Sequence, residues 1–220
     1  MTINRPGLPQ DLPPAERLWG RWALIAAAGA TTAAERRASA HRTGRWIDED
    51  GLHWDDGGCT WWVMSRRGDG RYVLYGEDES SAVKWHKPPV DMLAGGPAWL
   101  PWDELRDRLS GYELGCVYWY ENGAWARAPY PDTLDDDGLD CGMSALAVRA
   151  EAVELLAERV AAVADGPDAD AFLAQAETGR LDDVDAFLAR VRDPDGDEPD
   201  AAAVARALAL GGLAGEHATR

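Results

Sequence analysis

Lysine, cysteine and long apolar runs are scarce in this sequence. Its 220 residues carry 39 acidic against 22 basic side chains, giving a formal net charge of −17. Lys84 and Lys87 are the lysines, and arginine supplies the remaining basic charge. A protein that binds duplex DNA through its phosphates needs the opposite sign, so we expect no nucleic-acid partner. An acidic surface favours solubility and basic partners.

The few cysteines argue against a secreted disulfide scaffold. Cys59, Cys116 and Cys141 are odd in number and unpatterned in spacing, which fits a reducing compartment. The longest apolar run, residues 22–30, is far shorter than the roughly 20 residues that span a bilayer. Residues 1–10 lack the basic region and apolar core that export requires. We therefore expect a cytoplasmic protein without a membrane partner, and its Ala, Asp, Gly and Arg content is typical of a GC-rich bacterial genome.

Common catalytic signatures are also missing. The sequence has no phosphate-loop pattern, no Rossmann glycine fingerprint, no His-Glu-x-x-His, no Cys-x-x-Cys and no Gly-x-Ser-x-Gly. These absences remove the commonest enzyme classes, so the sequence favours a non-enzymatic protein without a cofactor. Hydrophobic residues still make up 46% of the chain, enough for a sizeable core in one large domain or in a smaller domain with an appendage.

Aromatic residues end abruptly along the chain. All eleven tryptophans lie within residues 19–125, and neither Trp nor Tyr follows Tyr130. Four prolines punctuate the start of the chain. We therefore predict a disordered lead-in at 1–13, an aromatic-rich α+β domain at 14–130, an acidic loop at 131–142 and a helical segment at 143–220.

The strongest strand signal lies in residues 59–77. Two aromatic and β-branched runs flank Gly68-Asp69-Gly70, which is typical of a hairpin turn. Trp61 and Trp62 point to opposite faces, and both faces of the hairpin are apolar. We expect this hairpin to lie in the middle of a sheet and to be covered on both sides.

A second hairpin is predicted for residues 116–127, around Asn122-Gly123. A two-residue loop pairs Tyr120 with Trp125 and gathers large side chains with polar tips on one face. This face consists of Tyr118, Tyr120, Trp125 and Arg127. Tyr, Trp and Arg contribute much of the energy of protein interfaces, which makes the face a candidate recognition surface. The alternative is that a helix covers it and the hydroxyls reach water.

Further elements complete the expected sheet. Residues 45–55 predict a hairpin with a two-residue turn at Asp50-Gly51, which pairs Ile47 with Trp54. Residues 82–86 suit a short strand. A helix over residues 14–42 carries an apolar stripe that would cover one face of the sheet. The predicted fold class is α+β, an antiparallel β-meander of five to six strands packed with helices and followed by an all-helical C-terminal segment.

The C-terminal part contains a short repeat. Asp-Ala-Phe-Leu-Ala occurs at residues 170–174 and again at residues 185–189. Two copies are too few for a solenoid, so we predict two similar helices that pack their Phe-Leu faces inward. Residues 144–163 predict a longer amphipathic helix, and Asp168 or Asp170 is expected to cap the helix that follows.

Several polar clusters are candidate sites. The acidic turn of Glu77, Asp78 and Glu79 is a second candidate binding surface, and His53 and His86 near Asp78 would be the site of a hydrolase or transferase. Residues 193–200 fail the calcium-loop pattern at its glycine and at its last glutamate. The aspartates of residues 132–140 are typical of a solvated turn, so no metal site is predicted.

Three stretches carry a resemblance to known sequences. Residues 75–81 form a strand that enters an acidic-Ser turn, residues 90–100 hold a Leu-Ala-Gly-x-Pro-x-Trp loop, and residues 115–120 are an aromatic strand. In these features the chain resembles a group of uncharacterised actinobacterial proteins over roughly residues 60–130. The resemblance implies no activity and no functional residues. The order of elements is also similar to that of small bacterial immunity proteins, a likeness of fold alone.

These features lead to one main hypothesis and two alternatives. The main hypothesis is a non-enzymatic protein-binding module, with immunity-like neutralisation of a basic partner as its role. The first alternative is a hydrolase or transferase with a site near His53, His86 and Asp78. The second alternative is a small-ligand binder that stacks rings on exposed Trp, which requires a concave cleft.

Overall fold

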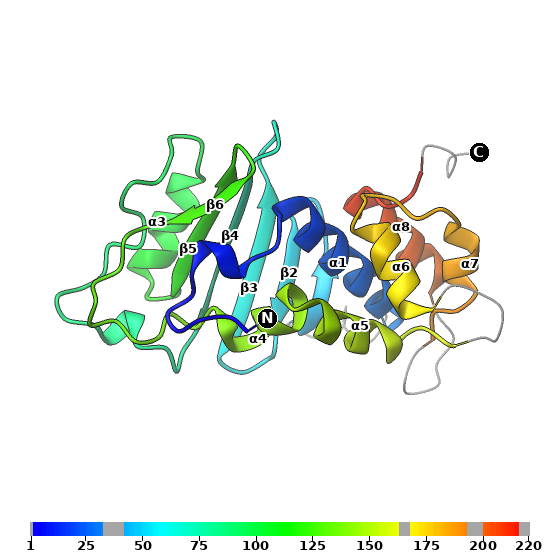
Figure 1. Cartoon of the computed structure of the whole chain (residues 1–220), viewed down its shortest axis with the longest axis horizontal. Helices are drawn as coiled ribbons and strands as arrows, with labels where there is room; N and C mark the ends of the chain where they lie inside the picture. Colours follow the sequence, from blue (N-terminus) through cyan, green and yellow to red (C-terminus); the bar gives the residue numbers. More distant parts are fainter. Residues whose placement is uncertain (1, 33–41, 163–167, 193–199, 216–220) are drawn as a thin grey trace. The chain divides into compact units, whose positions relative to one another are not determined.

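The computed structural model describes residues 2–32, 42–162, 168–192 and 200–215. Within these ranges six strands form an antiparallel sheet in the order β1-β2-β3-β4-β5-β6, and helices follow toward the C-terminus (Figure 1). The predicted α+β class and β-meander are therefore confirmed. In the described part of the chain, no helix combines the length and apolarity needed to cross a membrane.

The chain divides into two compact units. The first comprises residues 1–15 and 58–144, and the second comprises residues 16–57 and 145–220. The boundary between Ser144 and Ala145 lies close to the loop predicted at residues 131–142. The prediction placed the helix and the hairpin of residues 16–57 in the aromatic-rich domain. The structure groups them with the C-terminal helices instead.

The first unit is built on four of the strands. These are β3 (Thr60–Arg66), β4 (Tyr72–Asp78), β5 (Cys116–Glu121) and β6 (Ala124–Arg127). The predicted pairing of β5 with β6 is confirmed, with Tyr120 opposite Trp125. The hairpin of β3 and β4 is also confirmed, and Trp62 and Val73 on it are fully buried. Because both of its faces are apolar, this hairpin has to be covered on both sides, and the unit is built around it.

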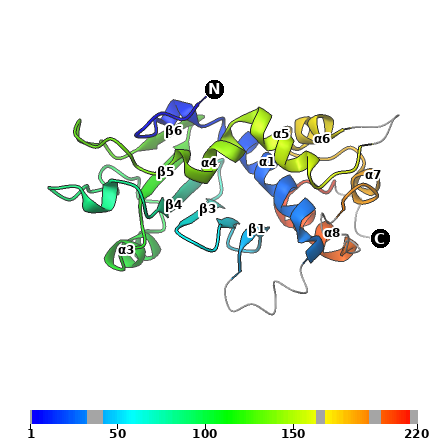
Figure 2. The ribbon, with the colours of Figure 1, turned by 90° about the horizontal axis from the view of Figure 1, so that it is seen from below.

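One face of these strands carries α3 (Trp102–Ser110). Leu105 of this helix packs in a cluster with Val63, Tyr75 and Val117. The first unit also contains the short 3-10 helices η1 (Pro9–Asp11) and η3 (Val83–Trp85). Figure 2 shows α3 on one side of β4 and β5 and the N-terminal segment on the other.

The second unit has α1 (Ala15–Ala28) at its centre, with Trp22 fully buried. The Trp19 indole N–H donates to the Gly211 carbonyl at 2.9 Å, and Arg21 pairs with Glu177 at 2.6 Å. These contacts explain why α1 belongs with the C-terminal helices. The remaining elements are η2 (Gly29–Thr32), β1 (Gly44–Ile47), β2 (Leu52–Asp55), α5 (Arg149–Ala157), α6 (Ala169–Ala176), α7 (Val184–Leu188) and α8 (Ala201–Gly211).

The two copies of the short repeat form α6 and α7. Asp168 caps α6 and Asp183 caps α7, each accepting a hydrogen bond from a backbone N–H three residues later. Phe172 and Phe187 therefore occupy the same position in their helices, and their rings meet edge to face at 5.2 Å. The predicted inward packing of the repeat is confirmed.

Two local predictions, the strand at residues 82–86 and the register of the hairpin near Asp50, are corrected by the structure. Residues 82–86 contain the 3-10 helix η3 instead of a strand. The hairpin near Asp50 has a four-residue loop, so that Ile47 pairs with Leu52 instead of with Trp54. The Asp48 carboxylate widens this loop by accepting the Asp50 N–H at 3.1 Å.

The helix predicted for residues 144–163 is divided. It consists of α4 (Asp140–Ala147) and α5, separated at Val148, whose backbone is extended. The end of the helix predicted for residues 14–42 falls partly on residues 33–41, and the acidic loop at 193–199 likewise lies outside the described residues.

Candidate functional site

The predicted aromatic recognition face is buried. Tyr118 is 0% exposed, Tyr120 is 5% exposed and Trp125 is 8% exposed. Arg127 is half-buried, with its guanidinium 3.7 Å from the centre of the Tyr130 ring. The face expected to meet a partner is therefore an internal face of the first unit.

The N-terminal segment covers this face. The Trp125 indole N–H donates to the Pro13 carbonyl at 2.7 Å, and Arg127 Nε donates to the Gly7 carbonyl at 2.9 Å. The Tyr118 hydroxyl lies 2.8 Å from the same Gly7 carbonyl. Residues 2–13 were expected to be disordered. They are instead held by the polar groups of the face that was predicted to bind a partner. The aromatic bodies and polar tips find their contacts inside the unit, as buried Tyr and Trp generally do.

Asp137 completes this attachment. One of its oxygens accepts the Gly7 N–H at 2.8 Å, and the other lies 2.8 Å from the Tyr118 hydroxyl. Gly7 has no room for a side chain, because a Cβ there would lie 2.7 Å from that hydroxyl. The segment is therefore fixed by close backbone approach as well as by hydrogen bonds.

The acidic turn after β4 is mostly internal as well. Glu77 and Asp78 are each 4% exposed, whereas Glu79 is exposed. Glu77 pairs with Lys84 at 2.8 Å. Burial raises the pKa of Glu77, although the hydrogen bond from Lys84 opposes this shift. Of the three predicted residues, Glu79 is the one whose side chain reaches solvent.

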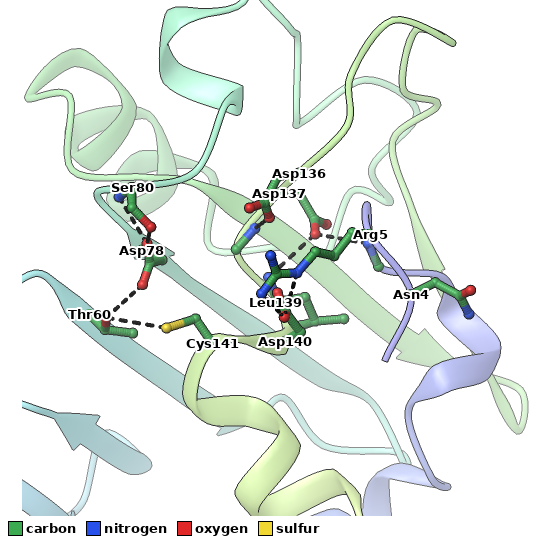
Figure 3. A network of polar contacts seen from close by, with 12 residues as sticks. Asn4, Arg5, Thr60, Asp78, Ser80, Asp136, Asp137, Leu139, Asp140 and Cys141 are labelled. Atoms are coloured by element: carbon green, nitrogen blue, oxygen red, sulfur yellow. Dashed lines mark hydrogen bonds and ion pairs between the residues drawn. The ribbon is translucent and has the colours of Figure 1, made fainter. Parts of the chain in front are cut away.

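Asp78 lies in a polar network of the first unit (Figure 3). Its Oδ2 accepts from the Thr60 hydroxyl at 2.8 Å, and its Oδ1 accepts from the Ser80 N–H at 2.8 Å. Cys141 Sγ lies 3.8 Å from the Thr60 hydroxyl. Burial disfavours the ionised form of Asp78, yet hydrogen bonds from Cys141, Ser80 and Thr60 hold its pKa below the usual range.

The thiol of this network is not activated. Burial and the hydrogen bond to Asp78 raise the pKa of Cys141 to about 11. A nucleophilic cysteine needs a lowered pKa and a neighbouring base or cation, so this thiol stays protonated and unreactive at neutral pH. In the same region Arg5 pairs with Asp140 at 2.7 Å (Figure 3). The network connects the N-terminal segment, the strands and residues 136–141.

The two candidate catalytic histidines have separate partners. His53 Nε2 lies 2.8 Å from Asp48 Oδ1, and its ring stacks on Trp46 at 4.9 Å in the second unit. In the first unit, His86 Nδ1 lies 2.8 Å from the Pro88 carbonyl and its Nε2 lies 2.9 Å from the Thr133 hydroxyl. Two cavities of the second unit, with volumes of about 650 Å³ and about 230 Å³, are lined by neither histidine. The enzyme alternative stays a prediction that none of these contacts favours.

In the part of the chain that the structure describes, no group of three or more His, Cys, Asp or Glu side chains is placed so that it could hold a metal ion. The acidic residues 132–140 lie within this part, whereas most of the loop at 193–200 lies outside it.

Sequence reasoning missed the most exposed aromatic residues. Among the described residues, Trp85 is 75% exposed and Tyr112 is 76% exposed. Trp85 belongs to η3 and stands between the two lysines, a placement that the strand prediction for residues 82–86 obscured. A tryptophan flanked by charged residues and followed by Pro88-Pro89 was the available signal for an exposed loop.

No family model matches the chain, and neither a curated protein nor a solved structure matches it.

Proposed function

We propose that the protein is a non-enzymatic binding module whose partner is another protein, and that Trp85 is the anchor of the contact. The observation that carries the proposal is the 75% exposure of this indole on a loop that buried Val83 and the Lys84–Glu77 ion pair hold in place. Exposed aromatic residues in a soluble protein are costly in water, and Trp is enriched among the residues that dominate interface energies.

The loop that presents Trp85 is held in place on both sides. Val83 is 2% exposed, and Lys84 is tied to Glu77. His86 contacts the Thr133 hydroxyl, which joins the loop to the acidic residues 132–140. A ring on a restrained loop loses little conformational freedom on binding, which favours affinity.

The charges around this loop support a basic partner. Asp132 and Asp135, on either side of the Thr133 contact, are exposed, and so is Glu79. Lys87, which is exposed on the same loop, carries a positive charge that partly offsets these carboxylates. An Arg or Lys of the partner would meet the face of the Trp85 indole in a cation–π contact, with the carboxylates at its rim. The formal net charge of −17 favours the same sign of partner over the whole chain.

The test is capture of a partner by the immobilised full chain from native bacterial lysate, followed by titration calorimetry with the purified partner. Trp85→Ala should weaken the affinity by about tenfold or more. Tyr112→Ala removes an equally exposed ring and should leave the affinity within about twofold, which makes it the matched control.

Two outcomes contradict the proposal. One is that the full chain enriches no protein above a blank matrix. The other is that the captured partner binds Trp85→Ala as tightly as the unmodified protein.

A further inference from the structure

The loop that carries Trp85 is held by a largely buried ion pair. Lys84 Nζ donates to Glu77 Oε1 at 2.8 Å, and the two side chains are 13% and 5% exposed. Lys84 belongs to η3, which has three residues and no side-chain cap. A single 3-10 turn is not stable by itself, so its position depends on what its side chains contact. Buried Val83 supplies the apolar contact of this turn, and Lys84 supplies a polar one.

The Glu77 carboxylate is only partly satisfied by hydrogen bonds. Its Oε1 accepts from Lys84, whereas its Oε2 is inaccessible to solvent and has no hydrogen-bond partner among the described residues. A buried carboxylate oxygen without a donor disfavours the ionised form. Burial accordingly raises the pKa of Glu77.

Other charged groups face Glu77 from the neighbouring segments. Glu79, in the turn after β4, and Glu113, which precedes β5, both raise the pKa of Glu77. On the α3 side, the Arg108 guanidinium lies 4.6 Å from the centre of the ring of Trp61, the residue opposite Glu77 in β3. The ion pair with η3 is therefore opposed by two nearby carboxylates.

Protonation of Glu77 must weaken its contact with Lys84. The hydrogen bond from Lys84 and its positive charge both lower the pKa of Glu77. Because linkage is reciprocal, the ionised carboxylate binds the ammonium more tightly than the protonated carboxyl does. β4 is paired with β3 on one side and with β5 on the other, so η3 is the part that is free to move. A buried ammonium without a counter-charge is costly, and the long Lys84 side chain reaches water when η3 shifts.

We propose that the Glu77–Lys84 ion pair is an acid-sensitive latch on the Trp85 loop. The ionised carboxylate holds η3 in place. When the carboxylate takes up a proton, Lys84 moves into water and residues 81–86 open locally. The latch is a property of the loop itself and does not depend on the proposed protein partner.

His86 holds the loop in either of its charge states. Its Nδ1 lies 2.8 Å from the Pro88 carbonyl, and its Nε2 lies 2.9 Å from the Thr133 hydroxyl. A carbonyl only accepts, so Nδ1 carries a proton, whereas the hydroxyl can donate to a neutral ring or accept from a charged one. Both contacts therefore persist when His86 is protonated, which leaves Glu77 as the acid-sensitive attachment.

Hydrogen exchange of the full chain, measured by mass spectrometry, tests the latch. The Trp85 N–H donates to the Ala82 carbonyl at 3.2 Å, so peptides that span residues 81–86 report on η3. After correction for the intrinsic pH dependence of exchange, opening of this segment should increase about threefold or more between about pH 7 and about pH 5. Exchange in β5 should not change, which separates local opening from unfolding of the whole unit.

Substitutions assign the effect to the ion pair. Glu77→Gln keeps the size of the side chain and removes its charge, so it should raise the opening of residues 81–86 about tenfold at neutral pH and abolish the pH dependence. Lys84→Gln should do the same, and it provides the test if circular dichroism shows that Glu77→Gln is unfolded. Glu79→Gln is the matched control, because this carboxylate is exposed and lies two residues further along the chain. It should keep the protection of the loop and its pH dependence.

The two lysines give an independent measurement. Lys84 and Lys87 are the lysines of the chain, and Lys87 is exposed. Under brief treatment with acetic anhydride at neutral pH, Lys84 should be acetylated at least about tenfold more slowly than Lys87, because its amine is paired and largely buried. In Glu77→Gln the two rates should become similar.

Any of four results would overturn the proposal. The first is corrected exchange in residues 81–86 that is unchanged or slower at the lower pH. The second is an equal change in β5. The third is a pH dependence that survives in the folded Glu77→Gln and Lys84→Gln variants. The fourth is acetylation of Lys84 in Glu77→Gln that is as slow as in the unmodified protein.

Discussion

At the scale of single residues, the first unit places ionisable groups where burial and hydrogen bonds act in opposite directions. Asp78 has a lowered pKa because three side chains donate to it, whereas its neighbour Glu77 has a raised pKa because burial dominates. Glu77 and Asp78 follow each other in β4, and their side chains point to opposite faces. Their different surroundings explain the opposite signs.

The decrease of the unfolding free energy at acidic pH should therefore depend on Asp78. Because its pKa is lower in the folded than in the unfolded protein, the folded state binds fewer protons, and the group stabilises the fold above its ordinary pKa of 3.8. This contribution is lost as the pH falls through the lower, folded pKa. In urea titrations at several pH values, the difference in unfolding free energy between the unmodified protein and Asp78→Asn should shrink on acidification below about pH 4.

Thr60→Val provides an intermediate case for this measurement. It keeps the carboxylate and removes one donor at 2.8 Å, so the folded pKa of Asp78 should rise toward its ordinary value. The acid-induced loss of stability should then be smaller than in the unmodified protein and should end at a higher pH. Parallel pH profiles for the unmodified protein and Asp78→Asn would refute this role of Asp78.

At the scale of elements, short or irregular segments are held in place by buried aromatic side chains. α7 has five residues, too few to be stable by itself, so its position depends on packing. Phe187 is fully buried and meets the 1%-exposed ring of Phe172 in α6. The N-terminal segment is a second example, because it has little regular structure and is held by buried side chains of β5 and β6.

The packing of α7 can be tested directly. Phe187→Ala should lower the free energy of unfolding by about 3–5 kcal/mol, because it removes a large buried ring and leaves a cavity. Asp185→Ala on the exposed side of the same helix should cost less than about 1 kcal/mol, and chemical denaturation measures both. Equal losses in the two variants would show that the ring contact does not hold the helix.

At the scale of the whole molecule, charge imbalance is the dominant property. A net charge of −17 on 220 residues produces self-repulsion, which destabilises a compact state. Several of the ion pairs among the described residues join exposed side chains, for example Arg206 with Glu49, and such pairs contribute little to stability.

Salt should therefore stabilise the protein. Raising the NaCl concentration from about 0.01 M to about 0.1 M shortens the screening length from about 30 Å to about 10 Å and should raise the melting temperature by about 2–4 °C at pH 7. The matched control is the same comparison near the isoelectric pH of about 4.5, where the effect should be much smaller. A lower melting temperature at higher salt and pH 7 would show that ion pairs outweigh the repulsion.

Local features were predictable from the sequence because neighbouring residues decide them. Asn122 and Gly123 adopt the positive φ values of 53° and 81° that a two-residue loop requires, and this sets the register of β5 and β6. Asp168 caps α6 and is one of the two residues expected to do so. The prediction for the loop near Asp50 missed a side-chain contact, since Asp48 bonds to the Asp50 backbone and to His53.

The fold class, the two apolar hairpins and the acidic balance follow from the sequence alone, because alternation, turn residues and composition act over short distances. Which surfaces are exposed depends on the packing of distant segments. The face of Tyr118 and Trp125 is covered by a segment more than 100 residues earlier in the chain, and the exposed ring proved to be Trp85. Arg45 and Arg159, 114 residues apart, meet at one cavity. Such encounters depend on how distant segments pack, and no local pattern in the sequence encodes that packing.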